Sequence, residues 1–214
     1  MSRSTLVLDL DNTIYPESWG LMDVISNRMV QFVRTRFQGD EVEVRGLIER
    51  YRSRFNSIAI GFMNDRRAEF DDFLRYSHEI DLSSYTPDAS LGDLLELSGF
   101  RRKFIFSNAP RVHVVNVLRK FELTGAFDDI VCIEDVGYRY KPSAAAFDAF
   151  YAITKSDPCD SVFVDDCVRN IEAARTRGSH TVHVSEALDA GARSDEMHGS
   201  LAEYLLSRCK GRKE

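Results

Sequence analysis

Five short apolar segments, each about the length of a β-strand, recur along the chain and alternate with stretches of helical spacing. They cover residues 6–10, 103–107, 129–133, 161–164 and 181–184. Strands that alternate with helices favour βαβ units and a parallel sheet, and right-handed crossovers place helices on both faces of such a sheet. We therefore expect an α/β fold with a doubly wound, Rossmann-like parallel-sheet core.

Apolar residues between these segments predict the faces that the core helices bury. Val112, Val115, Leu118 and Phe121 lie three residues apart and mark the buried face of one such helix. Ser90 precedes another apolar stretch and is of the residue type that caps a helix N-terminus. The polar tail after residue 186 predicts one helix near residues 201–206.

The stretch from about residue 15 to residue 85 interrupts the alternation of strands and helices. Helix formers dominate at 22–37, 41–55 and 66–78, and strand signals are few. We expect three or four helices that form an all-α insert. The predicted domains are thus a core of residues 1–14 and 86–214 and a helical cap of residues 15–85, placed where a lid would cover a bound ligand.

Composition narrows the class of protein. The 214 residues, 43% of them hydrophobic, suffice for one core with a smaller insert. A net charge of -6 disfavours a nucleic-acid-binding surface, and no apolar run approaches the length of a transmembrane helix. The four cysteines show no CxxC spacing, and no signal peptide is visible. We expect a cytoplasmic monomer or homodimer that acts away from membranes.

Two carboxylates follow the first apolar segment. Asp9 and Asp11 stand at i and i+2, so on a strand they point to the same side. Ligands bind at the carboxyl ends of the strands in open α/β sheets. Two like charges at that place have no use in folding, whereas a divalent metal ion together with a phosphate would explain them.

Three more polar groups follow later strand segments: Ser107 with Asn108, then Lys141, then Asp165 with Asp166. Singly they are ordinary, since Ser-Asn is typical of a turn, Lys-Pro of a solvated loop and an acid after a strand of an N-cap. Together they meet at one edge of a parallel sheet. Hard oxygen ligands suit Mg²⁺, and an ammonium, a hydroxyl and backbone N–H groups suit phosphate oxygens.

The order DxDxT, S-N, K-P and D-D resembles the haloacid dehalogenase-like (HAD) hydrolase superfamily, over nearly the whole chain through about residue 184. The second acid of the first motif, Asp11, indicates the phosphatase branch, because the dehalogenase branch lacks it. The resemblance implies a Rossmann-like core with a helical cap of the C1 type. His180 and His183, which flank residues 181–182, are expected at surface or edge positions rather than in a metal site.

The resemblance also implies catalytic roles. Asp9 is expected to be the nucleophile that forms an aspartyl-phosphate. Asp11 would protonate the leaving alkoxide and then deprotonate the hydrolytic water. Ser107, the backbone N–H of Asn108 and Lys141 would bind the phosphoryl oxygens, and Lys141 would also pair with Asp9.

The expected cofactor is Mg²⁺, and the same resemblance names its ligands. Asp9 and the backbone carbonyl of Asp11 would bind the ion. Asp166 aligns with the direct carboxylate ligand of the fourth motif. Asp165 would act on the metal through water or would orient Lys141.

The segments 9–16, 106–109 and 164–171 resemble the pyrimidine 5′-nucleotidase subfamily more closely. They predict a small phosphate ester as substrate, a pyrimidine nucleoside 5′-monophosphate. The cap segment 55–62 keeps Gly61 but has Asn56 where Gly is usual. Tyr51, Phe55 and Phe62 could stack on a base, as could Met63, with Arg52 or Arg54 at its polar edge; the alternative is that these side chains pack the cap helices together.

Other readings stay open at this point. The same chemistry would serve a sugar-phosphate or phosphoglycolate phosphatase. In a phosphotransferase of the phosphoglucomutase type, the aspartyl-phosphate would pass its group to a sugar instead of water. A catalytically silent binding or scaffold protein on this fold is a further alternative, because a fold alone does not give a function.

Overall fold

The computed structural model describes residues 3–37, 39–187 and 193–210. The chain divides into two compact units. We call Met1–Trp19 with Leu82–Glu214 the core unit, and Gly20–Asp81 the helical unit. Residues 15–19 and 82–85 thus belong to the core unit. The action of the helical unit as a cap stays a prediction.

A parallel sheet forms the middle of the core unit, and its strand order is β3-β2-β1-β4-β5-β6. Every neighbouring pair in that order is parallel. The first strand lies between β2 and β4, so the chain winds outward on one side of β1 and then on the other. The strands are β1 (Thr5–Leu8), β2 (Arg102–Phe106), β3 (Asp129–Val131), β4 (Ser161–Asp165), β5 (His180–Val184) and β6 (Glu196–His198).

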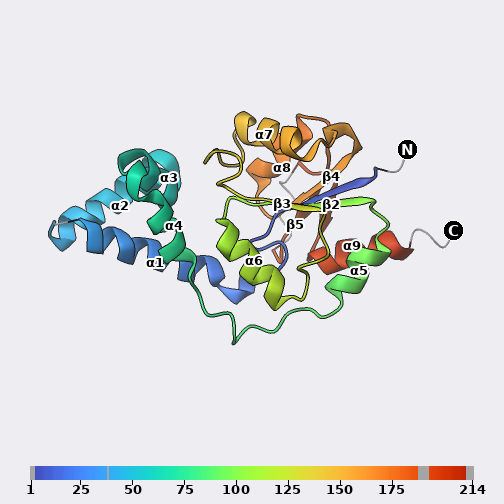
Figure 1. Cartoon of the computed structure of the whole chain (residues 1–214), viewed down its shortest axis with the longest axis horizontal. Coiled ribbons are helices and arrows are strands. Elements are labelled where there is room, and N and C mark those ends of the chain that lie inside the picture. The colour runs from blue at the N-terminus through green and yellow to red at the C-terminus, as the bar shows by residue number, and fades with distance from the viewer. Residues whose placement is uncertain (1–2, 38, 188–192, 211–214) are drawn as a thin grey trace. The chain divides into compact units, whose positions relative to one another are not determined.

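Helices cover both faces of this sheet, as Figure 1 shows: α7 and α8 lie on one face and α5, α6 and α9 on the other. The doubly wound α/β core expected from the sequence is therefore confirmed. Its helices are α5 (Leu91–Leu97), α6 (Arg111–Lys120), α7 (Ala144–Thr154), α8 (Val168–Arg175) and α9 (Leu201–Lys210).

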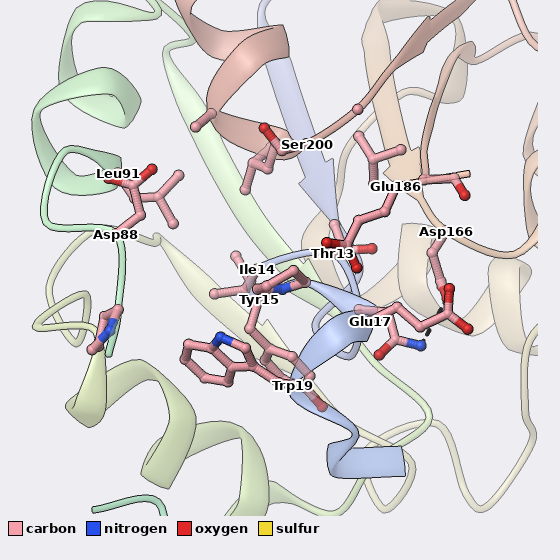
Figure 2. A pocket seen from close by; sticks show the side chains of 18 of the residues that line it. Thr13, Ile14, Tyr15, Glu17, Trp19, Asp88, Leu91, Asp166, Glu186 and Ser200 are labelled. Carbon is pink, nitrogen blue, oxygen red and sulfur yellow. Dashed lines mark hydrogen bonds between the residues drawn. The ribbon is translucent and has the colours of Figure 1, made fainter. Parts of the chain in front are cut away.

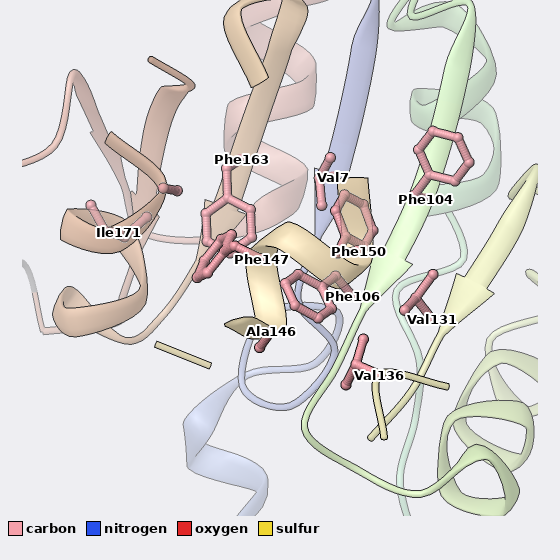
Figure 3. Close-up of a cluster of buried hydrophobic side chains, with 11 residues drawn as sticks. Val7, Phe104, Phe106, Val131, Val136, Ala146, Phe147, Phe150, Phe163 and Ile171 are labelled. Carbon is pink, nitrogen blue, oxygen red and sulfur yellow. The ribbon is translucent and has the colours of Figure 1, made fainter. Parts of the chain in front are cut away.

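The face beneath α7 holds an aromatic core (Figure 3). Phe106 stacks on Phe150 with ring centroids 4.5 Å apart, and Phe147 meets the edge of Phe106 at 5.3 Å. Phe163 and Val7 lie in the same cluster and are fully buried. Burial of each such side chain contributes about 1.5–3 kcal/mol, so this layer holds the ends of β1, β2 and β4 rigidly in place.

The helical unit consists of α1 (Leu21–Arg36), α2 (Glu41–Phe55), α3 (Ile58–Asp65) and α4 (Phe70–His78), which confirms the predicted helices. Asp40 caps α2 through a capping box with Glu43. Phe32, Phe62 and Phe73 form its aromatic core, with centroid distances of 4.5 to 5.6 Å.

The structure corrects some local predictions. The buried face of α6 carries His113, Val114, Val117 and Leu118, whereas Val112 is 48% exposed. Ser90 precedes α5, but its side chain makes no capping bond. The short strand β6 lies in the tail, where the apolar pattern indicates no strand. No helix within the described residues is long and apolar enough to cross a membrane.

Candidate active site

The carboxyl ends of three neighbouring strands bring the sequence motifs together. Leu8 pairs in register with Ile105 of β2 and Val164 of β4. The backbone N–H of Asp9 therefore continues the ladder and donates to the carbonyl of Val164 at 2.9 Å. Asp9, Ser107 and Asp165 each follow the paired residues Leu8, Ile105 and Val164 by one or two positions. Strand β1 lies where the direction of winding reverses. Ligand sites of α/β sheets form at this kind of switch point.

Lys141 joins two of these strand ends. Its Nζ donates to Asp9 Oδ1 at 2.7 Å and to Asp165 Oδ2 at 2.8 Å. The Lys141 side chain is 1% exposed, and those of Asp9 and Asp165 are 10% and 0% exposed. Burial lowers the pKa of Lys141, but the charges of Asp165 and Asp9 more than offset this and raise it above its ordinary value. The two carboxylates thus favour the charged form of the ammonium.

Asp165 is held by several donors in addition to Lys141. The backbone N–H of Cys167 donates to its Oδ1 at 2.8 Å. The Asn170 amide donates to both carboxylate oxygens at 3.0 and 3.1 Å. This satisfied, buried carboxylate has the arrangement expected of a group that orients Lys141.

Asn108 and Ser107 support the other side of the site. The Asn108 side chain accepts from the backbone N–H of Lys141 at 2.7 Å and donates to its carbonyl at 3.1 Å. These two bonds fix the loop from which the lysine reaches inward. The Ser107 hydroxyl is buried and accepts from the N–H of Ala109 at 3.0 Å.

Three carboxylates converge at this edge. Asp9, Asp165 and Asp166 each offer an oxygen, and these oxygens lie within 4.8 Å of one another. Asn12 has φ 58°, a left-handed conformation that Asn tolerates, and its amide donates to Asp166 at 3.2 Å. Burial, followed by the charge of Asp165, raises the pKa of Asp166 to about 7.

The charges at this edge do not balance. Burial raises the pKa of Asp9 well above its ordinary value; Lys141 opposes this, and the neighbouring carboxylates add to it. Three carboxylates against one ammonium leave a charge of minus two when all are ionised. A divalent cation bound by carboxylate oxygens would offset that charge and keep Asp9 ionised.

Asp11 faces a different set of partners. Its Oδ1 accepts from the Tyr15 hydroxyl and lies 2.8 Å from His113 Nε2. Its charge contributes to the raised pKa values of both Asp9 and Asp166, which places it beside the cluster. No sequence motif pointed to His113. The signal that could have done so is a polar ring on the apolar face of a helix, where a partner is required.

His183 also departs from the expectation for its position. It is 3% exposed, not at the surface, and its Nε2 donates to the backbone carbonyl of Asp166 at 2.8 Å. His180, by contrast, is partly exposed and pairs with Glu196 at 2.7 Å. His183 therefore supports the loop that carries the acid pair.

A cavity of about 320 Å³ opens beside Asp166 in the core unit. Figure 2 shows Tyr15 and Trp19 on one side of it and Asp166 with Glu186 on another. Of the described residues that line it, none is basic, and four are acidic. Acidic side chains without a basic one do not favour an anion, whereas Lys141 provides a positive charge at the neighbouring strand ends.

Two of the side chains considered for stacking on a base are buried inside the helical unit and cannot reach a ligand. Tyr51 and Phe62 are fully buried. A Cβ at Gly61 would stand 2.3 Å from Tyr51 Cγ, and the Tyr51 hydroxyl donates to Asp65 at 2.8 Å. Both side chains pack the helices together. Phe55 and Met63 are partly exposed, and Arg52 and Arg54 are exposed.

The sequence model of one family, the haloacid dehalogenase-like hydrolases, matches residues 4–178. The chain belongs to this family. The match includes every motif residue described above. The Rossmann-like core of this HAD-like chain agrees with that family, and the acidic cluster stands at the place where its sheet reverses its winding.

A curated relative of this HAD-like hydrolase is Phosphate metabolism protein 8 of Saccharomyces cerevisiae, which is 25% identical over 203 residues. The match covers 86% of this chain and 63% of the relative. The chain thus spans less than two thirds of the relative's length.

Solved structures from several organisms share the fold. The HAD hydrolase YfnB from Bacillus subtilis, solved with bound magnesium, has a TM-score of 0.65 at 15% identity, covering 97% of this chain and 99% of that one. A HAD phosphatase from Thermococcus onnurineus has a TM-score of 0.63 at 19% identity, with 99% and 98% covered. L-2-haloacid dehalogenase from Xanthobacter autotrophicus, with chloropropionic acid covalently bound, has a TM-score of 0.59 at 12% identity, with 96% and 98% covered. At these identities the likeness shows the fold alone.

Proposed function

We propose that this HAD-like hydrolase is a Mg²⁺-dependent phosphomonoesterase that cleaves a pyrimidine nucleoside 5′-monophosphate through an aspartyl-phosphate. The observation that carries the proposal is the buried contact of Lys141 with Asp9 and Asp165, beside a third carboxylate. Such a set combines a nucleophile, a fixed cation for phosphoryl oxygens and a place for a metal ion.

Asp9 is the nucleophile of the proposed reaction. A carboxylate is weak as a nucleophile, so its oxygen must be held in line with phosphorus and relieved of repulsion by the phosphate charge. The bond from Lys141 to Oδ1 at 2.7 Å restricts the rotation of the Asp9 carboxylate. Lys141, the Ser107 hydroxyl and the N–H of Asn108 then neutralise and bind the phosphoryl oxygens as charge builds up in the transition state.

Asp11 is the proposed general acid and base. In the first step it protonates the oxygen of the leaving alcohol as the P–O bond breaks and the bond from Asp9 to phosphorus forms. In the second step it removes a proton from the water that attacks phosphorus, which releases Asp9 and inorganic phosphate. Proton transfer of this kind contributes about 10²–10⁴-fold to a rate.

Mg²⁺ fits the donor set, because the three convergent groups are hard carboxylate oxygens within 4.8 Å of one another. Asp9 and Asp166 would hold the ion together with the backbone carbonyl of Asp11, and Asp165 would act indirectly because Lys141 and Asn170 occupy it. When bound, Mg²⁺ would neutralise negative charge on the carboxylates and the phosphoryl oxygens.

The substrate class is the finer part of the proposal. It is supported by the resemblance of segments 9–16, 106–109 and 164–171 to pyrimidine 5′-nucleotidases and agrees with a relative named for phosphate metabolism. The presence of Asp11 favours phosphate esters over haloacids. We propose that the helical unit acts as the cap that selects the leaving group. The cytoplasmic location and the monomeric or homodimeric state stay predictions.

A substrate panel tests the function. The purified chain is incubated with Mg²⁺ and with UMP, CMP, AMP, a hexose phosphate, phosphoglycolate or L-2-chloropropionate, and released phosphate or chloride is measured. We expect phosphate from UMP and CMP at the highest kcat/KM, none in EDTA and none from the Asp9→Asn variant. A preference for the hexose phosphate or phosphoglycolate overturns the proposed substrate class. Chloride release without phosphate release overturns the proposed phosphatase activity.

A further inference from the structure

We propose that His113 and Tyr15 are positioning residues that together fix the orientation of Asp11 for proton transfer to the leaving group. The inference rests on the proposed function and extends it, because it assigns roles to two residues that the proposed mechanism does not use. Proton transfer needs the carboxylate held in one orientation towards the leaving oxygen.

Two side chains converge on one oxygen of Asp11. His113 Nε2 lies 2.8 Å from Asp11 Oδ1, and the Tyr15 hydroxyl donates to the same oxygen. The two donors come from different elements, since His113 lies in α6 and Tyr15 in the loop after β1. Two donors on one oxygen set both the position and the rotation of a carboxylate, which a single bond does not.

Each donor is itself immobilised. His113 is 1% exposed and lies on the buried face of α6 together with Val114 and Val117. Tyr15 is 1% exposed, and its ring stacks on Trp19 with centroids 5.3 Å apart and planes 7° apart. Side chains held by packing on rigid elements are those that can hold a catalytic group to the accuracy that proton transfer needs.

The arrangement suits both halves of the proposed reaction. Oδ1 accepts from His113 and Tyr15 whether Asp11 is ionised or carries its proton on Oδ2, so the two bonds persist through the cycle. We assign the transferred proton to Oδ2. It passes to the oxygen of the leaving alcohol in the first step and is regained from the attacking water in the second, while Oδ1 stays bound.

Comparison of two leaving groups distinguishes the positioning of Asp11 from a general effect on folding. An alkoxide needs a proton as it departs, whereas p-nitrophenolate is a stable anion and does not. The experiment measures the first-turnover release of leaving group from the best alkyl phosphate of the panel and from p-nitrophenyl phosphate, with Mg²⁺ and saturating enzyme. The variants are His113→Leu, His113→Gln and Tyr15→Phe. The amide N–H of Gln can occupy the place of Nε2, and Phe keeps the stack on Trp19.

We expect His113→Leu to slow release of the alkyl leaving group on the order of 10–100-fold. This is less than the full contribution of about 10²–10⁴-fold from a general acid, because Asp11 itself remains. Release of p-nitrophenol should slow by less than about 3-fold. Tyr15→Phe should act in the same direction, and His113→Gln should recover most of the loss. Equal losses on both esters, or a Gln variant no better than Leu, would overturn the inference. A wild-type chain that turns over neither ester overturns the proposed function instead. If His113→Leu does not fold, Tyr15→Phe decides the matter by the same ratio.

Discussion

Lys141 Nζ donates to Asp9 Oδ1 at 2.7 Å, although the two residues lie 132 positions apart in the chain. The contact is out of reach of solvent, and Asp165 accepts from the same ammonium at 2.8 Å. A buried charge is tolerated when it is paired and hydrogen-bonded. The proposed nucleophile is therefore part of an ion network that the fold itself needs.

Removal of Lys141 should damage both stability and activity. In Lys141→Met, two buried carboxylates lose their cation, and loss of one partner of such a pair costs about 3–5 kcal/mol of unfolding free energy. Denaturant unfolding without Mg²⁺ measures the loss. Lys141→Arg should stay inactive, because the planar guanidinium does not replace a compact ammonium between two carboxylates. Lys120→Met is the matched control, since Lys120 is partly exposed, and it should change stability by less than about 0.5 kcal/mol.

The metal-free protein should lose stability as pH rises towards neutrality. The pKa of Asp166 is raised from 3.8 to about 7 by burial and by the charge of Asp165. Between those values the Asp166 carboxyl binds more protons in the folded than in the unfolded state. Its contribution to the unfolding free energy therefore falls with rising pH and stops changing above about 7. One proton gives a slope of at most about 1.4 kcal/mol per pH unit. Denaturant unfolding in EDTA across this range compares wild type with Asp166→Asn, which should show a shallower slope. Identical slopes would show that Asp166 titrates normally.

Magnesium should stabilise the folded protein through the same carboxylates. A ligand that binds only the folded state adds about 2.7 kcal/mol at 100 times its Kd. Thermal unfolding with Mg²⁺ and with EDTA should therefore give a higher Tm with the metal. The shift should shrink in Asp166→Asn and persist in Asp148→Asn, whose carboxylate is 72% exposed and pairs only loosely with Arg177 at 3.4 Å. A shift of equal size in Asp166→Asn would place the ion elsewhere.

Two glycines of the helical unit should respond in opposite directions to the same substitution. A Cβ at Gly61 would lie 2.3 Å from Tyr51 Cγ, so Gly61→Ala should destabilise by about 1–3 kcal/mol. Gly46, in α2, has nothing within 4 Å of its added Cβ, and Gly46→Ala should stabilise by roughly 0.5–1 kcal/mol. Thermal unfolding of the two variants checks the pair. If Gly61→Ala proved neutral, the packing of Tyr51 against α3 would be wrong.

Strands β1 to β5 and the convergence of the motif residues could be predicted from sequence because both follow from local patterns. Apolar runs indicate buried strands, and parallel winding brings their carboxyl ends to one edge whatever the details of packing. These two rules are enough to predict that Asp9, Ser107 and Asp165 lie close together.

The parts that could not be predicted depend on partners far away in the chain. On α6, two stripes have helical spacing, and the buried stripe is the one with His113, whose ring meets Asp11 across 102 residues. Tyr51 has an aromatic ring that could stack on a ligand. Because Gly61 has no side chain, α2 and α3 instead pack closely around that ring. Strand β6 carries Glu, Met and His with no apolar alternation, and pairing with β5 alone defines it.

Trapping of the covalent intermediate tests the account most directly. The chain is mixed with Mg²⁺ and the best ester of the panel, quenched in acid within one turnover and reduced with borohydride, which converts an aspartyl-phosphate into homoserine. Peptide mass spectrometry should find homoserine at position 9 in the wild type and at no position in Asp9→Asn. Homoserine at another acidic residue, or full turnover by Asp9→Asn, would contradict the assignment of Asp9 as the group that accepts the phosphoryl.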